Sequence, residues 1–251
     1  MVKLRKVSAA AKAATKATAI AMAVTRNVTV NDSTSERLKE ALHALSLTAT
    51  PSQQAALLEY LSQLLRWNKT YNLTAIRDPE QALVHHIFDS LSLVPSISSV
   101  VSAHSDHAPM IVDVGSGGGL PGVVLAIMLP DVRVICIDAV EKKTMFIRQM
   151  AGVLALLNLT ALHARIETLE PLQSLIVTSR AFASLEDFAR LAGAHVCEGG
   201  YLLAMKGHPP NEEIEALQTL TTWSTQVVQP LIVPELDSQR CLVWMQRKGT
   251  Q

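Results

Sequence analysis

Apolar residues recur at three- and four-residue spacing between residues 33 and 94, and this pattern predicts amphipathic helices. The first helix is expected to begin at a capping box formed by Ser33 and Glu36. A second helix is expected over about residues 52–67 and a third over about 78–94. Together they predict a helical cap that covers residues 35–98.

The pattern changes after the cap, in residues 99–251, where short apolar runs alternate with amphipathic segments. The predicted strands are 110–114, 133–137, two short strands near 160 and 175, 200–205, one near 227, and 241–246. The predicted helices are 121–129, 141–156, 184–196 and 211–220. Alternation of this kind favours a doubly wound, Rossmann-like α/β sheet, and the last two strands are close enough in sequence to form an antiparallel pair.

The charge of the chain is unevenly distributed. Lysine and arginine together number 22, as do aspartate and glutamate, but the first 31 residues carry six basic residues and no acid. The rest of the chain is therefore net acidic, so attraction to a nucleic acid must come from a local patch or from the tail. We expect residues 1–34 to be a basic, disordered extension, with an organellar transit peptide or a structured segment as the alternatives.

Composition and cysteine spacing indicate the cellular environment in which the protein works. A chain of 251 residues that is 49% hydrophobic can bury a substantial core. Cys136, Cys197 and Cys241 are too far apart for a metal-binding spacing or a disulfide framework. We therefore expect reduced cysteines, a cytoplasmic location and no metal requirement. The basic tail has no apolar run long enough to cross a bilayer, and no membrane partner is expected.

The segment 111–122 reads as a buried strand, a glycine-rich turn and the start of a helix, with Pro121 suited to the first helical turn. Gly117, Gly119 and Gly122 match the G-x-G-x-x-G spacing of dinucleotide-binding proteins, a weak match by itself. We expect free N–H groups of this loop to face the crevice at the carboxyl end of the strand, where a nucleotide-like cofactor binds.

Two acidic residues favour a particular cofactor. Asp113 lies inside the strand before the loop, and Asp138 ends the next predicted strand. This is the pattern of enzymes that use S-adenosylmethionine, because one carboxylate can meet the ammonium of the cofactor and the other its ribose hydroxyls. The alternatives are that Asp113 caps the loop and that Asp138 is a helix N-cap. An NAD-type oxidoreductase shares these features, although the sequence lacks a Tyr-x-x-x-Lys element.

Five segments together resemble a known family, and they are residues 67–74, 86–90, 113–122, 179–183 and 206–207. In order and spacing they are similar to the motifs of the RsmG (GidB) family, over roughly residues 35–248. That family consists of bacterial class I methyltransferases that transfer a methyl group from S-adenosylmethionine to N7 of one guanine in the 530 loop of 16S ribosomal RNA. A noncatalytic RNA-binding or ribosome-assembly factor with the same fold is the second alternative.

The resemblance implies positions for the cofactor and for catalysis. It adds Gly115, Leu120, Ile166, Glu167 and Arg180 to the cofactor site. With the residues named above, the full expected cofactor set is Asp113, Gly115, Gly117, Gly119, Leu120, Asp138, Ile166, Glu167 and Arg180. Arg180 and Lys206 are the candidate catalytic residues. A salt bridge within the fold is the alternative for Arg180.

The resemblance also implies 16S ribosomal RNA or the small ribosomal subunit as the partner. The expected RNA contacts are Asn72, Lys142, Lys143 and Arg165, in a patch that also includes Lys69, Arg77 and Lys206. Trp67 and Tyr71 lie one helical turn apart, and they either stack on a displaced base or close the cap against the sheet. The chain departs from the family at His85, where an arginine is usual, and at Lys143, where the pair is commonly Lys-Arg.

Overall fold

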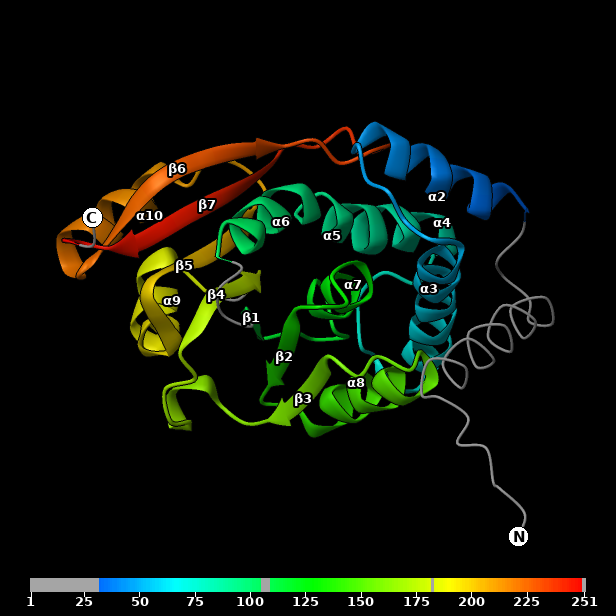
Figure 1. The fold of residues 1–251 in the computed structure, drawn as a ribbon, viewed down its shortest axis with the longest axis horizontal. Helices are drawn as coiled ribbons and strands as arrows, with labels where there is room; N and C mark the ends of the chain where they lie inside the picture. The colour runs from blue at the N-terminus through cyan, green and yellow to red at the C-terminus, as the bar shows by residue number, and fades with distance from the viewer. Residues whose placement is uncertain (1–31, 105–108, 182, 250–251) are drawn as a thin grey trace, which may run out of the picture.

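The computed structural model of the chain describes residues 32–104, 109–181 and 183–249 (Figure 1). Most of the predicted N-terminal extension, residues 1–31, lies outside the described residues. Within the described ranges, no helix combines the length and the hydropathy that crossing a membrane requires.

The N-terminal part is helical, as predicted, but its third helix contains a π-helical turn and ends early. Its elements are α2 (Asp32–Ala44), α3 (Pro51–Tyr71), α4 (Pro79–Ala82), a π-helical turn η1 (Leu83–Phe88), α5 (Asp89–Leu91) and α6 (Val94–Ala103). The helix expected over about 78–94 is present as one continuous helical run over 79–91, with a π-helical turn inside it, and it ends at residue 91 instead of 94. Pro95 lacks the N–H that a continuing helix needs. The helix therefore ends with α5, and a new helix, α6, begins at Val94 and extends to residue 103.

The capping box lies elsewhere than predicted. Ser33 is inside α2, because the described helix already includes Asp32. The capping box belongs instead to α3, where Thr50 Oγ1 accepts the Gln53 N–H at 3.2 Å and Gln53 Oε1 accepts the Thr50 N–H at 2.9 Å. Pro51 follows at the first helical position, where a missing N–H costs nothing.

The sheet has the strand order β3-β2-β1-β4-β5-β7-β6. The strands are β1 (Met110–Val114), β2 (Arg133–Asp138), β3 (Leu159–His163), β4 (Ser174–Arg180), β5 (Val196–Lys206), β6 (Trp223–Leu231) and β7 (Arg240–Arg247). The first five pair in parallel, whereas β7 runs antiparallel to both β5 and β6. The predicted antiparallel final pair and the predicted Rossmann-like α/β fold are confirmed.

The connecting helices are α7 (Gly122–Met128), α8 (Glu141–Val153), α9 (Leu185–Ala192) and α10 (Asn211–Leu220), with short 3-10 turns η2 (Ile166–Thr168) and η3 (Gly193–His195). Pro121 precedes α7 as its N-cap residue instead of lying in its first turn. Helix α8 ends three residues before the predicted position. The helix expected over 184–196 is too long, because the chain turns at η3 and β5 begins at Val196.

The sheet is covered on both faces (Figure 1). Helices α7 and α8 pack on one face with the N-terminal helices, and α9 and α10 cover the other. Leu57 of α3 and Phe88 of η1 belong to the same buried cluster as Ile111 of β1 and Phe146 of α8. The cap and the sheet therefore bury their apolar faces against each other, and their division into domains at residues 98 and 99 stays a prediction.

Asp113 holds the turn between β1 and α7. Its side chain is fully buried, and its Oδ2 accepts the Gly122 N–H at 2.9 Å, at the positive end of α7. A Cβ atom at Gly122 would lie 2.8 Å from the same oxygen, so only glycine allows this approach. Asp113 thus caps the helix that follows the loop.

Burial raises the pKa of Asp113 to about 6, although the hydrogen bond from Gly122 acts in the opposite direction. Its second oxygen, Oδ1, has no hydrogen-bond partner within the described chain. The folded protein therefore favours the protonated acid more than the unfolded chain does, since an unfolded aspartate has a pKa of about 3.9.

This difference predicts how stability depends on pH. The contribution of protonated Asp113 is fully present below about pH 4 and is lost as the pH rises through about 6. Between pH 4 and pH 7, we expect the unfolding free energy of the wild type to fall by about 2 kcal/mol relative to Asp113→Asn, which cannot titrate there. Urea denaturation of both proteins at each pH measures the difference. Parallel profiles would contradict the prediction.

Candidate cofactor and RNA site

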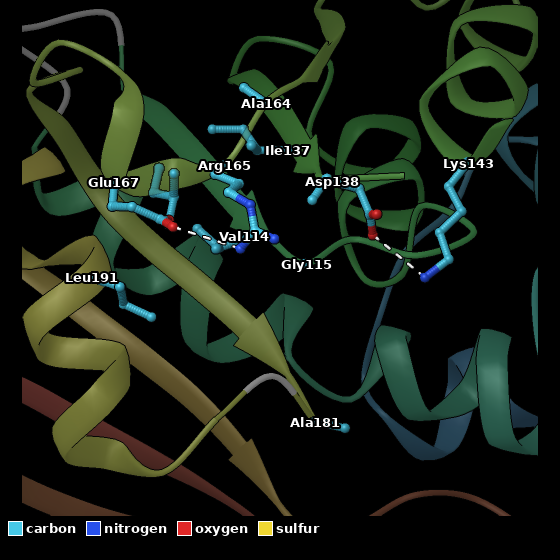
Figure 2. A pocket seen from close by; sticks show the side chains of 12 residues that line it. Val114, Gly115, Ile137, Asp138, Lys143, Ala164, Arg165, Glu167, Ala181 and Leu191 are labelled. Carbon is cyan, nitrogen blue, oxygen red and sulfur yellow. Dashed lines mark ion pairs between the residues drawn. The ribbon is translucent and has the colours of Figure 1, made fainter. Parts of the chain in front are cut away.

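A cavity of about 300 Å³ opens at the carboxyl ends of β1 and β2 (Figure 2). Its lining comes from the ends of both strands, the turn η2 after β3, the residue that follows β4, and helices α8 and α9. The lining residues are Val114, Gly115, Ile137, Asp138, Ala139, Lys143, Ala164, Arg165, Ile166, Glu167, Ala181 and Leu191. The cavity therefore lies where the sequence predicts a cofactor.

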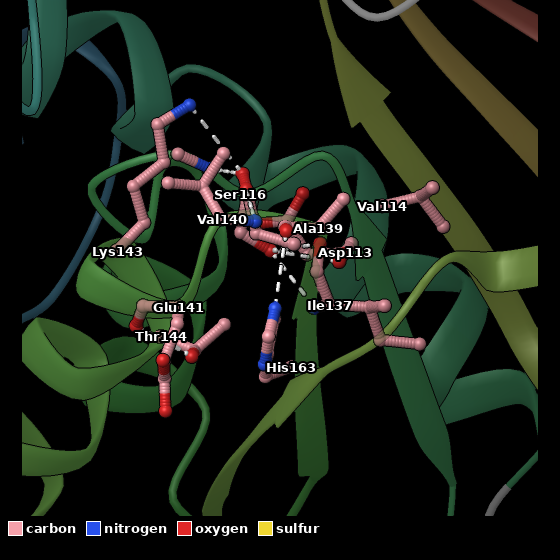
Figure 3. A network of polar contacts seen from close by, with 12 residues as sticks. Asp113, Val114, Ser116, Ile137, Ala139, Val140, Glu141, Lys143, Thr144 and His163 are labelled. Atoms are coloured by element: carbon pink, nitrogen blue, oxygen red, sulfur yellow. Dashed lines mark hydrogen bonds and ion pairs between the residues drawn. The ribbon is translucent and has the colours of Figure 1, made fainter.

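Asp138 joins the glycine loop to the start of α8, within the network of polar contacts in which Figure 3 labels Ser116, Val140 and Lys143. Its Oδ2 accepts the Gly117 N–H and its Oδ1 accepts the Val140 N–H, both at 2.8 Å, while Lys143 Nζ lies 3.7 Å from Oδ2. The N-cap residue of α8 is Val140, so Asp138 lies two positions before the cap. Each carboxylate oxygen has a second lone pair, and a ligand in the cavity can donate to it.

The glycine loop uses most of its own N–H groups internally, contrary to expectation. Gly115 and Ser116 both donate to the carbonyl of Ile137, at 2.8 and 3.1 Å. Gly119 donates to the carbonyl of Ser116, and its φ of 95° requires the freedom of glycine. Tyr60 of α3 donates to the carbonyl of Gly118 at 2.7 Å and so fastens the cap to the loop.

The structure brings several of the predicted cofactor residues together. Gly115, Asp138, Ile166 and Glu167 all line the cavity, and Figure 2 shows the ion pair of Glu167 with Arg165 on the side away from Asp138. The other predicted residues do not line it, and they are Asp113, Gly117, Gly119, Leu120 and Arg180. Asp113 and Gly117 instead help to hold the glycine loop beside the cavity, because Asp113 accepts the Gly122 N–H and Gly117 donates to Asp138.

Arg180 lines a second cavity, of about 420 Å³, that shares only Ala181 with the first. Its Nη1 donates to Asp89 Oδ2 at 2.9 Å and to the His85 carbonyl at 2.8 Å. Arg240 Nε donates to the other oxygen of Asp89 at 3.1 Å. Arg180 therefore forms a salt bridge within the fold through its Nη1 atom, which is the alternative considered for this residue in the sequence analysis.

Neither Asp89 nor Arg240 is predictable as a site residue from spacing alone. Asp89 nevertheless falls on the buried face of the cap, and a buried carboxylate requires a charged or hydrogen-bonding partner. In the sequence, the signal for Asp89 is its place in the segment 86–90, one of the five that resemble the family motifs.

Lys206 is likewise held by internal partners. Its Nζ lies 2.7 and 3.1 Å from the two carboxylate oxygens of Glu213 and 3.0 Å from the carbonyl of Ala183. These contacts use the donors of the ammonium group. The geometry therefore gives Lys206 the role of fixing the loop after β4 at the wall of the second cavity.

The predicted RNA contacts lie on different surfaces. Lys142 is exposed on α8, while Lys143 and Arg165 line the first cavity. Asn72 ends α3 with a φ of 50°, and its Oδ1 accepts a hydrogen bond from Arg77 at 2.9 Å. The structure therefore does not gather all four predicted residues into one patch.

The two aromatic residues of α3 have different environments. The Trp67 ring lies 5.4 Å from that of Phe146 and 5.0 Å from that of Tyr71. Trp67 therefore packs against helix α8, not directly on the sheet, and is half-buried, whereas Tyr71 is 42% exposed. Within the described ranges, no three His, Cys, Asp or Glu residues are grouped so as to hold a metal ion.

Comparison with known proteins places the chain in a family. The model of the GidB family, described as rRNA small subunit methyltransferase G, matches residues 53–243. A protein of that name from Bordetella pertussis is 59% identical over 85% of this chain and 93% of its own length. One from Methylibium petroleiphilum is 45% identical over 86% of this chain and 95% of its own length.

Among solved structures, a SAM-dependent methyltransferase from Aquifex aeolicus is 16% identical, with a TM-score of 0.49 over 74% of this chain and 97% of its own. The family match and the identities to the curated relatives confirm the resemblance seen in the sequence: the chain belongs to the rRNA small subunit methyltransferase G (GidB) family.

Proposed function

We propose that this chain transfers the methyl group of S-adenosylmethionine to N7 of a guanine in the 530 loop of 16S ribosomal RNA. The observation that carries the proposal is the cavity at the ends of β1 and β2, lined by Asp138, in a chain of the methyltransferase G family. The curated relatives are named as small subunit RNA methyltransferases, which does not favour an NAD-type oxidoreductase or a noncatalytic factor.

The residues of the first cavity fit the proposed cofactor. Asp138 offers carboxylate lone pairs, which suit vicinal hydroxyl groups. Val114, Ile137, Ile166 and Leu191 give apolar surface for a purine ring, and the nearby backbone offers hydrogen bonds to its edge. When bound, S-adenosylmethionine supplies an electrophilic methyl carbon on a sulfonium leaving group.

The residues of the chain act by positioning. The N7 lone pair of guanine forms the new N–C bond as the C–S bond breaks, and the electron pair of that bond goes to sulfur. Positive charge moves to the base, and no proton is transferred, so no general base is needed. Asp138 fixes the loop and the start of α8 with two hydrogen bonds, which keeps the cavity wall rigid while the reacting atoms are aligned.

Arginine has a restricted role in this mechanism. A bidentate contact from arginine to O6 and N7 of guanine is common in recognition, but here it would occupy the reacting lone pair. Any contact from Arg180 to the base is therefore limited to O6 or a phosphate, and the donors of Lys206 are already used by Ala183 and Glu213. The small ribosomal subunit or its RNA is the proposed partner, and the cytoplasm is the proposed location.

The proposal is tested by mapping 7-methylguanine in 16S ribosomal RNA from cells with and without the gene for this chain. We expect one site in the 530 loop to be methylated in the first and unmethylated in the second. Restoring the gene should restore the modification. An unchanged map would contradict the proposed reaction.

Asp138 provides a direct test of the cofactor site. Asp138→Asn replaces the carboxylate that faces the cavity by an uncharged amide with a single oxygen acceptor. We therefore expect the dissociation constant for S-adenosylmethionine to rise about tenfold or more. Asp131→Asn is the matched control, because Asp131 is exposed in the turn before β2, at the opposite end of the strand. Isothermal titration calorimetry measures both. Equal affinities in the two variants would refute the role of Asp138.

Lys142 tests the RNA surface beside the cavity. Lys142 is chosen instead of Lys143 because Lys143 lies near Asp138 in the cofactor site. Lys142→Glu reverses an exposed charge on α8 and leaves the cofactor site unchanged. We expect weaker binding to the small subunit and a salt dependence reduced by about one phosphate contact. Lys39→Glu on α2 serves as the control. The prediction of an RNA-binding patch at Lys142 is wrong if Lys142→Glu and Lys39→Glu both show the salt dependence of the wild type.

A further inference from the structure

The second cavity adjoins the first at a single residue. It lies at the carboxyl ends of β4 and β5, beneath η1 and α5 of the cap, and the residues that line it are Ile76, His85, His86, Asp89, Arg180, Ala181, Met205, Lys206, Gly207 and Arg240. Ala181 lines both cavities and adopts a left-handed φ of 53°. A molecule in the second cavity is therefore a neighbour of a molecule in the first.

The charged lining of the second cavity offers hydrogen-bond donors. Both oxygens of Asp89 are occupied by Arg180 and Arg240, and the side chain is 3% exposed. Within the described chain, Nε and Nη2 of Arg180 make no hydrogen bond, and neither does Nη2 of Arg240. These donors favour a ligand that presents acceptors.

His86 adds a buried donor to this lining. It is 4% exposed, and its Nδ1 has no hydrogen-bond partner within the described chain. Its Nε2 lies 2.9 Å from Thr74 Oγ1, which already accepts the Ile76 N–H at 3.2 Å. The hydroxyl hydrogen of Thr74 can be donated to Nε2, and in the tautomer that accepts it the imidazole hydrogen is on Nδ1.

The imidazole is uncharged at neutral pH. Burial, and then the nearby charge of Arg180, lower the pKa of His86 to about 4. His86 thus presents one N–H donor without adding positive charge next to a base that becomes cationic on methylation.

We propose that the second cavity is the subsite for the target base, and that the Nδ1–H of His86 and the unpaired N–H groups of Arg180 recognise the O6 oxygen of a 6-oxopurine. The inference rests on the proposed function and deepens it by assigning the residues that choose the base. His86 is the specificity-determining residue, and Asp89 is a positioning residue that fixes the guanidinium group of Arg180.

The chemistry of the two purines explains the choice. Guanine presents two acceptors on its major-groove edge, O6 and N7, whereas adenine presents a 6-amino donor beside N7. Donors at O6 leave the N7 lone pair free to react. The amino group of adenine would face the donors of His86 and Arg180 unpaired, at a desolvation cost. A donor-lined pocket therefore selects against adenine.

The test varies the target base with the wild-type protein, and then varies His86 with guanine RNA. The substrate is small-subunit RNA in which the methylated guanine is kept or replaced by 2-aminopurine, which lacks O6. Rates of methyl transfer are divided by the rates at which dimethyl sulfate alkylates N7 of each nucleoside. After this correction, we expect the wild type to prefer guanine at least about tenfold, as expected for the loss of a buried hydrogen bond. A corrected preference below about twofold would overturn the inference.

Two substitutions separate the nitrogen atoms of His86. His86→Asn keeps an N–H near the position of Nδ1, whereas His86→Gln keeps a polar group near Thr74 and loses the donor at Nδ1. We expect transfer to guanine RNA to fall about tenfold in the glutamine variant and less than about threefold in the asparagine variant. His43→Gln, exposed on α2, is the control and should match the wild type. Equal losses in the two His86 variants would overturn the role of Nδ1.

Binding of S-adenosylmethionine, measured by calorimetry, separates this inference from the proposed function. It should be unchanged in every variant, because the first cavity does not include His86. If the wild type binds the cofactor and methylates both RNAs equally after correction, the base subsite alone is refuted. If it methylates neither RNA, both proposals fail. Should a His86 variant not fold, the comparison of the two RNAs with the wild type still decides.

Discussion

Parallel pairing of β1 with β2 and with β4 is the constraint on which the rest of the structure depends. In this register Val114 is opposite Ile137, and Asp113 is opposite Thr178. The three strands therefore end at the same edge, and the residues that follow them meet there. Both cavities open at this edge and share Ala181, which directly follows β4. Chain order alone would not bring these segments together, since 66 residues separate Gly115 from Ala181.

The environment of each carboxylate at this edge decides what it does. Asp113 is fully buried, which raises its pKa, and its Oδ2 caps α7 by accepting the Gly122 N–H. Asp138 is held by two backbone N–H groups and faces the first cavity. Asp89 is enclosed by two arginines, so its charge is balanced where water cannot reach it. Of these three carboxylates, Asp138 is the one that lines the first cavity.

Much of the fold was predictable because hydrophobic periodicity directly reports which face of an element is buried. The seven strands and the order of the helices follow from that pattern. The break between α5 and α6 was indicated only by Pro95, and the π-helical turn η1 has no periodicity of its own. Strand β5 begins before the apolar run 200–205, because pairing of Val196 with Ser174 extends the strand beyond its hydrophobic part.

The candidate site was only partly predictable. Gly115, Asp138, Ile166 and Glu167 line one cavity, because residues at the ends of parallel strands converge, and their binding of the cofactor stays a prediction. His85 and Asp89, the partners of Arg180, lie 95 and 91 residues away from it in the sequence. Spacing along the chain contains no information about such contacts. The second cavity, formed between cap and sheet, is therefore visible only in three dimensions.

The central claim is that the cavity at the ends of β1 and β2 presents a methyl donor to a guanine of the small subunit. The most direct measurement uses purified full-length chain, S-adenosylmethionine labelled in the methyl group, and small subunits or deproteinised RNA from cells that lack the gene. The account predicts that the label is recovered as 7-methylguanine at one site in the 530 loop. Recovery on another base or atom, or no transfer from protein that binds the donor, would contradict it.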